Sequence, residues 1–172
     1  MAKVSLRTWN ARAQSPHFWF VTGFGVGMLK PAPGTWGSLQ GLILGISMIS
    51  LGITEAELIA AVIVVTAISS LSINQIEKAA GIHDAPEIII DEVAGQWLAL
   101  VPLVALPHSY LLYTLSFVLF RFFDVLKPWP ISWLDKTVTG GFGVMVDDIA
   151  AGILAAFGIC VLLATGLLDG FI

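Results

Sequence analysis

The sequence has 172 residues, of which 57% are hydrophobic and only 12% are charged. An average soluble domain is about a quarter charged and less than half apolar, so this composition is typical of a small integral membrane protein. The net charge of −4, with eight Lys and Arg residues, argues against nucleic acid as a partner. The single cysteine, Cys160, excludes a disulfide framework and a thiolate metal cluster. The length is that of one domain, residues 1–172.

Four stretches without a charged residue are long enough to be considered as membrane segments. They are residues 31–54, 58–76, 93–120 and 149–168. A helix needs about 20 residues, at about 1.5 Å each, to cross the hydrocarbon core of a bilayer. The second and fourth stretches meet this requirement. The first meets it only if the turn at residues 35–38 lies at the membrane surface.

The third stretch is too long for one crossing and short for two. Pro102 and Pro107 interrupt helical hydrogen bonding near its middle. We therefore expect a hairpin of two short helices, residues 93–106 and 109–123, each about 20 Å long. Lipid-exposed irregular backbone is costly at that depth, so the pair is expected to be partly re-entrant or shielded by neighbouring helices.

The basic residues test this topology. If the hairpin counts as two passes, every Lys and Arg falls on one face or at its membrane edge. They are Lys3, Arg7, Arg12, Lys30, Lys78, Arg121, Lys127 and Lys136. The positive-inside rule assigns that face to the cytoplasm. The predicted fold class is an all-α, small polytopic membrane helical bundle with short or partly re-entrant helices and cytoplasmic active-site loops.

A glycine-rich segment precedes the first stretch. Residues 23–38 read GFGVGMLKPAPGTWGS and contain five glycines and Lys30. Backbone amides at the positive end of a helix favour a bound anion, and Lys30 would add a charge. A tight turn with Thr35 or Ser38 as the helix N-cap explains the same pattern equally well.

Acidic residues collect at the predicted cytoplasmic ends of the membrane helices. A single acid in a first helical turn is explained by the helix dipole, but several near a bilayer are costly unless paired, protonated or bound to a cation. Oxygen ligands without cysteine and with few histidines favour Mg²⁺. The predicted metal ligands are Asp91, Glu92, Asp124, Asp147 and Asp148.

Two of these acidic segments are similar to each other. Residues 147–151 read DDIAA and residues 91–95 read DEVAG, each after three apolar residues. The likeness suggests two helix N-termini that present paired carboxylates to one region. Lys127 lies three residues after Asp124, on the same face if the helix continues that far. A metal held by the acids would bind a phosphate together with Lys127, as in phosphoryl transfer. Trp129 and Trp133 suit a membrane–water interface.

Five motifs, taken in order, resemble those of the phosphatidylglycerophosphatase A family. They are the segment ending in PGTWGS at 33–38, GIHD at 81–84, DEVAG at 91–95, RxxDxxKPWPIxWxD at 121–135 and MVDDIxAG at 145–152. The resemblance covers residues 23–152. It implies a protein of the bacterial inner membrane, and with the topology above we expect a multi-pass protein whose active site faces the cytoplasm. The implied activity is Mg²⁺-dependent conversion of the phospholipid phosphatidylglycerophosphate to phosphatidylglycerol and inorganic phosphate.

Roles within that activity are inferences from residue chemistry. The predicted catalytic set is Asp91, Glu92, Asp124, Lys127, Asp148 and His83. The predicted substrate-binding set is Lys30, Gly34, Thr35, Ser38 and Lys127. Water polarised by the metal would attack phosphorus, with a remaining carboxylate or His83 as proton acceptor. A covalent aspartyl phosphate is an alternative, and a surface hydrogen-bonding pair with Asp84 is the more common role for a histidine such as His83.

A small cation or proton transporter is the alternative function, because acids within a membrane also build cation pathways. Transport predicts acids in the middle of the membrane. Here they collect at helix ends on one face, which favours a lipid headgroup. The sequence carries no signal for an oligomeric state.

Overall fold

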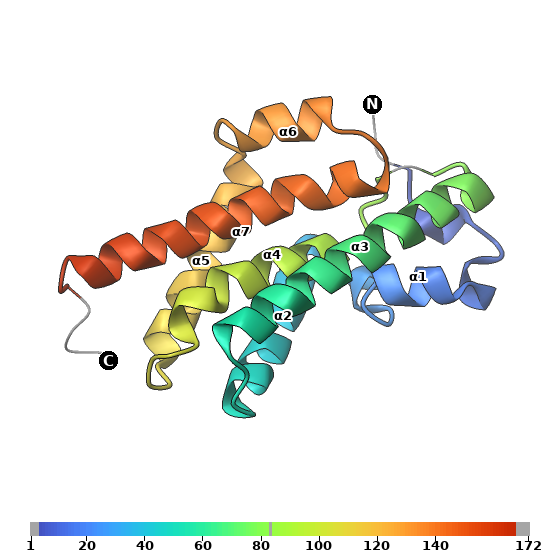
Figure 1. The fold of residues 1–172 in the computed structure, drawn as a ribbon. Helices are drawn as coiled ribbons and strands as arrows, with labels where there is room; N and C mark the ends of the chain where they lie inside the picture. Colours follow the sequence, from blue (N-terminus) through green and yellow to red (C-terminus); the bar gives the residue numbers. More distant parts are fainter. Residues whose placement is uncertain (1–3, 83, 168–172) are drawn as a thin grey trace.

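The structure, a computed structural model, describes residues 4–82 and 84–167. In this part of the chain every regular element is helical (Figure 1), which confirms the predicted all-α class. The α-helices are α1 (Pro16–Val21), α2 (Pro33–Ser50), α3 (Glu55–Ala80), α4 (Ile90–Leu100), α5 (Tyr110–Leu126), α6 (Ile131–Thr137) and α7 (Gly140–Ala164). Short 3-10 turns occupy Leu6–Thr8, Arg12–Gln14, Val26–Met28 and Val101–Leu103.

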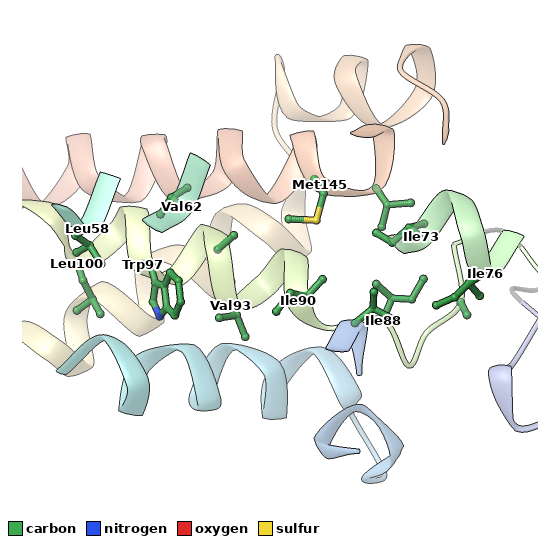
Figure 2. Close-up of a cluster of buried hydrophobic side chains, with 14 of the residues drawn as sticks. Leu58, Val62, Ile73, Ile76, Ile88, Ile90, Val93, Trp97, Leu100 and Met145 are labelled. Carbon is green, nitrogen blue, oxygen red and sulfur yellow. The ribbon is translucent and has the colours of Figure 1, made fainter. Parts of the chain in front are cut away.

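Helix α4 lies at the centre of the bundle and packs against α2, α3, α5 and α7. Figure 2 shows α4 between α7 and α2, with Val93 and Trp97 directed toward α2. The indole N–H of Trp97 donates to the Gly41 carbonyl at 3.0 Å, which satisfies a polar atom in this apolar layer. Helices α2, α4 and α7 begin at the same end of the bundle (Figures 1 and 2). Asp91 and Glu92 lie in the first turn of α4, and Asp147 and Asp148 lie in the part of α7 that is close to this end.

Helices α3 and α7 are, among the described residues, the two that are long and apolar enough to cross a membrane. They have 26 and 25 residues, with mean hydropathies of 2.2 and 2.1. Helix α3 contains the whole predicted stretch 58–76, and α7 contains residues 149–164 of the stretch 149–168. Helix α3 begins with a capping box in which Thr54 and Glu57 exchange hydrogen bonds, and it ends at Gly81 in the left-handed conformation. Helix α2, with 18 residues, is not among the helices that meet this test.

The start of α7 differs from the prediction. It begins at Gly140, nine residues before the expected start at residue 149, so Asp147 and Asp148 lie about two turns inside the helix. The early start has a partner in α3, because the Gly141 N–H donates to Asn74 Oδ1 at 2.7 Å. This bond satisfies one of the amides that a helix N-terminus leaves without an intrahelical partner.

The predicted hairpin is present, but its first helix, expected over residues 93–106, begins three residues earlier and ends six residues earlier than predicted. Helix α4 ends at Leu100, the turn Val101–Leu103 contains Pro102, and α5 returns from Tyr110. Pro102 stands near the start of that turn, where its missing N–H costs little. The eleven residues of α4 span about 16 Å, too little to cross a bilayer.

Helices α4 and α7 cross at two glycines. A Cβ on Gly152 would lie 2.3 Å from the Gly95 carbonyl oxygen, and a Cβ on Gly95 would lie 2.6 Å from the Asp148 carbonyl oxygen. Because Asp91 precedes Gly95 by four residues, as Asp148 precedes Gly152, the crossing brings these two carboxylates to the same place. In the structure, Asp148 is therefore the counterpart of Asp91. The alignment of DDIAA with DEVAG in the sequence had instead matched Asp147 to Asp91, one residue earlier.

The crossing can be tested with a matched pair of substitutions. Gly152→Ala places a methyl group against backbone, which should cost about 1–3 kcal/mol or more and lower the midpoint of thermal unfolding in detergent by several degrees. Gly158 lies on the same helix, but a Cβ there meets Leu119 Cδ1 at an ordinary 3.5 Å. Gly158→Ala should therefore keep or raise the midpoint, because alanine favours a helix by up to about 1 kcal/mol. Equal midpoints for the two variants would contradict the close crossing.

Candidate active site

A polar cavity of about 110 Å³ lies between helices α4, α5, α6 and α7, and Asp84 lines it from the loop that precedes α4. Its walls carry seven carboxylates and one lysine: Asp84, Asp91, Glu92, Asp124, Asp135, Asp147, Asp148 and Lys127. All five predicted metal ligands and Lys127 are thus brought together, although they come from three separate parts of the chain. Their individual roles stay predictions.

Three of the carboxylates converge most closely. Asp91 and Glu92 are half-buried in the first turn of α4, and Asp148 is buried in α7. One oxygen from each residue lies within 4.8 Å of the other two, a separation that suits three ligands of a single cation. Glu92 Oε2 is buried and has no hydrogen-bond partner among the described residues. A buried carboxylate oxygen without a partner is costly, and a bound cation would remove that cost.

The pKa values of Asp91 and Glu92 reflect the same crowding. Burial is the largest cause for both residues, and neighbouring carboxylates add to it. Together these effects raise the pKa of Asp91 well above its usual range and the pKa of Glu92 to about 8, although the side-chain hydrogen bond with Asp91 and the charge of Arg121 partly oppose the shift at Glu92. The site therefore holds its full negative charge at neutral pH only when a positive charge compensates it.

Lys127 forms the cationic side of the cavity. It follows the last residue of α5 in the left-handed conformation, with φ at 42°. Its ammonium donates to Asp135 Oδ1 at 2.7 Å and to Asp147 Oδ2. Burial alone would lower the pKa of Lys127, but the bonds and charges of the two carboxylates outweigh it and raise the pKa above its ordinary value. The lysine is therefore a permanent positive charge.

The condition for Lys127 and Asp124 to share a helical face, that the helix continues to residue 127, is not met. Helix α5 ends at Leu126, and the left-handed residue after it turns the lysine away toward Asp147. Asp124 instead pairs with Arg121, one turn earlier on α5. Arg121 also donates to Ser38 Oγ at 3.1 Å, and so connects α5 to α2.

The glycine-rich segment reaches the acids through one face of α2. A Cβ on Gly34 would lie 2.4 Å from Glu92 Oε1, and Ser38 Oγ donates to the Gly34 carbonyl at 2.9 Å. Helix α2 already begins at Pro33, so Ser38 lies inside the helix and neither it nor Thr35 is the N-cap. Lys30 and Thr35 are exposed and line no part of the cavity. Thr35 lies about 100° around the helix from Gly34, outside the face that packs on α4.

Three residues of the site were not given roles from the sequence. Asp84 and Asp135 line the cavity, and Arg121 forms an ion pair with Asp124, which is one of the lining residues. Asp135 and Arg121 belong to the same long motif as Lys127, and this shared motif could have indicated a role for them. Only the position of α6 shows that Asp135 accepts a hydrogen bond from Lys127. His83 lies outside the described residues, although its neighbour Asp84 reaches the cavity.

Comparison with known proteins agrees with these motifs. Residues 19–163 match the family model described as Phosphatidylglycerophosphatase A. The chain is 38% identical over 141 residues to phosphatidylglycerophosphatase A of Haemophilus influenzae, covering 82% of this chain and 85% of the relative. It is 36% identical over 146 residues to phosphatidylglycerophosphatase A of Escherichia coli, covering 84% and 82%.

A third relative comes from Bacteroides thetaiotaomicron and carries the provisional name phosphatidylinositol-3-phosphatase. It is 36% identical over 138 residues, covering 77% of this chain and 84% of the relative. No solved structure was found to match the chain. With the two apolar helices α3 and α7, the family match makes this a membrane protein. The chain belongs to the phosphatidylglycerophosphatase A family.

Proposed function

We propose that this protein is a Mg²⁺-dependent lipid phosphatase that hydrolyses phosphatidylglycerophosphate to phosphatidylglycerol and inorganic phosphate in bacterial phospholipid synthesis. The observation that carries the proposal is the convergence of Asp91, Glu92 and Asp148 beside Lys127 in one cavity. The names of the H. influenzae and E. coli relatives support the substrate.

The donor set fits Mg²⁺. Every side chain at the convergence point offers carboxylate oxygen, which is the ligand type that Mg²⁺ prefers. Asp91, Glu92 and Asp148 would hold the ion, and the buried Glu92 Oε2 provides an oxygen with no hydrogen-bond partner among the described residues. When bound, Mg²⁺ supplies a Lewis acid that withdraws charge from a phosphate and lowers the pKa of water.

The charge of the cavity is a second argument for a cation. Seven carboxylates line it against one lysine, with Arg121 behind Asp124. A phosphate monoester is itself an anion, so these carboxylates would repel it from the metal-free cavity. The predicted role of Mg²⁺ thus includes making the cavity accessible to its substrate.

The residues of the chain then have separate tasks. Lys127 donates to the terminal phosphate, and Asp135 and Asp147 hold the ammonium in place for it. A carboxylate that does not hold the cation accepts a proton from the attacking water. The new bond joins the water oxygen to phosphorus, and the bond from phosphorus to the glycerol oxygen breaks. The leaving glycerol oxygen takes up a proton, which completes the hydrolysis.

We also propose a multi-pass orientation in the bacterial inner membrane, with the cavity facing the cytoplasm. Lys78 lies in the last turn of α3, and Asn74 on the same helix contacts the start of α7. Basic residues and cavity therefore share one end of the bundle, as the positive-inside rule requires for a cytoplasmic site. A cation pathway would instead need acids along the middle of a spanning helix, whereas Asp147 and Asp148, the eighth and ninth residues of α7, share one cavity with the acids in the first turn of α4.

The proposal predicts Mg²⁺-dependent phosphate release by the purified protein in detergent. Release from phosphatidylglycerophosphate should stop with EDTA and return with excess Mg²⁺. Asp148→Ala and Lys127→Ala should each lower turnover by about 100-fold or more, because each removes a charge that contacts the cation or the phosphate. Glu55→Ala, an exposed acid at the opposite end of α3, should keep normal turnover.

Two outcomes would contradict this assignment. Near-normal turnover in both Asp148→Ala and Lys127→Ala would exclude the cavity as the active site. Faster release from phosphatidylinositol 3-phosphate than from phosphatidylglycerophosphate would leave the cavity in place and change the substrate. Membrane insertion and the unfolding midpoint of each variant serve as controls for folding.

The raised pKa of Glu92 predicts an inverse dependence of stability on pH without metal. Between its ordinary pKa of 4.5 and about 8, folded Glu92 keeps a proton that the unfolded chain releases. Stability should therefore fall as pH rises through this range, and the unfolding midpoint in EDTA should drop by roughly 5 °C or more. Mg²⁺, which binds the ionised form, should cancel the fall. Glu92→Gln should flatten the profile in EDTA, and Glu55→Gln should not. A profile in EDTA that rises with pH would contradict the raised pKa.

A further inference from the structure

The cavity has a buried floor and an exposed mouth. Asp148 and Asp147 at the floor are only 4% and 7% exposed. The side chains of Lys127 and Asp135, in contrast, are 31% and 41% exposed. Exposure thus increases toward the turn between α5 and α6, and a ligand reaches the acids most directly from this side.

Exposed apolar side chains lie on α5 and at the start of α6, before and after Lys127 in the sequence. Val118, Phe122 and Val125 form an exposed stripe on α5 at helical spacing, each more than half exposed. The stripe leads to Trp129 and Trp133 on either side of the start of α6, which are 79% and 56% exposed. We call these five residues the corner surface. Lys127 lies between the stripe and the tryptophans in sequence, so the segment that supplies the cation of the cavity also carries the corner surface.

A bilayer accounts for both halves of the corner surface. The stripe is aliphatic and aromatic, as a face in contact with acyl chains requires. Tryptophan prefers the level of the lipid headgroups, and the two tryptophans follow the end of α5 that lies beside the cavity. The corner surface therefore runs from the hydrocarbon to the headgroup level and ends where the cavity opens.

A second candidate surface for the acyl chains is an apolar groove of about 510 Å³ between α3 and α7. On α7 its walls are Val146, Ile149 and Ile153, whereas the cavity uses Val144, Asp147 and Asp148. These two sets lie on opposite faces of α7. A lipid whose phosphate occupies the cavity would have to pass around α7 to place its tails in the groove, so the corner surface is the better position for them.

We propose that the acyl chains of the lipid substrate lie against the corner surface, so that the phosphate enters the cavity sideways from the bilayer past Asp135 and Lys127. This proposal rests on the proposed phosphatase function and adds the route and the surface by which a membrane-bound substrate is recognised. The corner surface contacts only the tails and the interface. Its loss should weaken binding of a long-chain lipid without changing the chemistry at phosphorus.

The test compares two substrates and three double variants. Phe122→Ala with Val125→Ala removes part of the stripe, and Trp129→Ala with Trp133→Ala removes the aromatic pair. Each double variant should raise the apparent KM for long-chain phosphatidylglycerophosphate in vesicles by about tenfold. Activity on a short-chain, water-soluble analogue should stay within about twofold of wild type.

The matched control is Ile63→Ala with Ile153→Ala in the groove, where the side chains are similarly exposed at 64% and 55%. This variant should behave as wild type on both substrates. A selective loss on vesicles in the groove variant would place the tails there and overturn the proposal. An equal loss on both substrates in the corner variants would also overturn it, because it would show an effect on the cavity itself.

A second measurement does not depend on turnover. The tryptophan fluorescence of wild type in vesicles, minus that of the double variant Trp129→Phe with Trp133→Phe, gives the signal of these two residues. Lipids brominated near the headgroup should quench that signal more strongly than iodide in the water. Strong quenching by iodide alone would place the corner surface in water, and protection from both quenchers would indicate a second copy of the chain covering it. If wild type released phosphate from neither substrate, the proposed function would fail, and quenching alone would still report where the corner surface lies.

Discussion

The close crossing of α4 and α7 at Gly95 and Gly152 is the constraint on which the site depends. Backbone approaches backbone there without an intervening side chain, and the two helices pack like small-residue pairs in membranes. One turn before each glycine stands an aspartate, Asp91 or Asp148. The apolar packing that holds the bundle together therefore also forces like charges into one cavity.

Much of this arrangement follows from the sequence. The charge-free stretches place α3 and α7, and Pro102 and Pro107 indicate the hairpin of α4 and α5, because helix length and proline chemistry are local properties. The motifs likewise identify the acids and Lys127 as neighbours. These predictions succeed since each depends on residues a few positions apart or on a requirement of the bilayer that applies to any helix.

The remaining features depend on contacts between distant residues. The early start of α7 is supported by Asn74 of α3, which no local pattern at residues 140–148 reveals. Lys127 does not share a helical face with Asp124, because the helix ends at Leu126 and the left-handed backbone at Lys127, rare for a lysine, turns its side chain toward Asp147. Lys30 was expected near a phosphate because of its position in the glycine-rich segment, but it precedes α2, is exposed and lines no part of the cavity.

The bond between Asn74 and Gly141 has a consequence for the behaviour of the bundle in membranes of different thickness. At the start of α7 the two helices are in close backbone contact, because a Cβ on Gly141 would lie 2.0 Å from the Ser70 carbonyl oxygen of α3. Toward their other ends the two helices diverge (Figure 1). A thinner or thicker bilayer is accommodated by helix tilt, and tilting about this contact displaces the free ends most. Hydrophobic mismatch is thus expected to be absorbed far from the acids, leaving the spacing of the carboxylates unchanged.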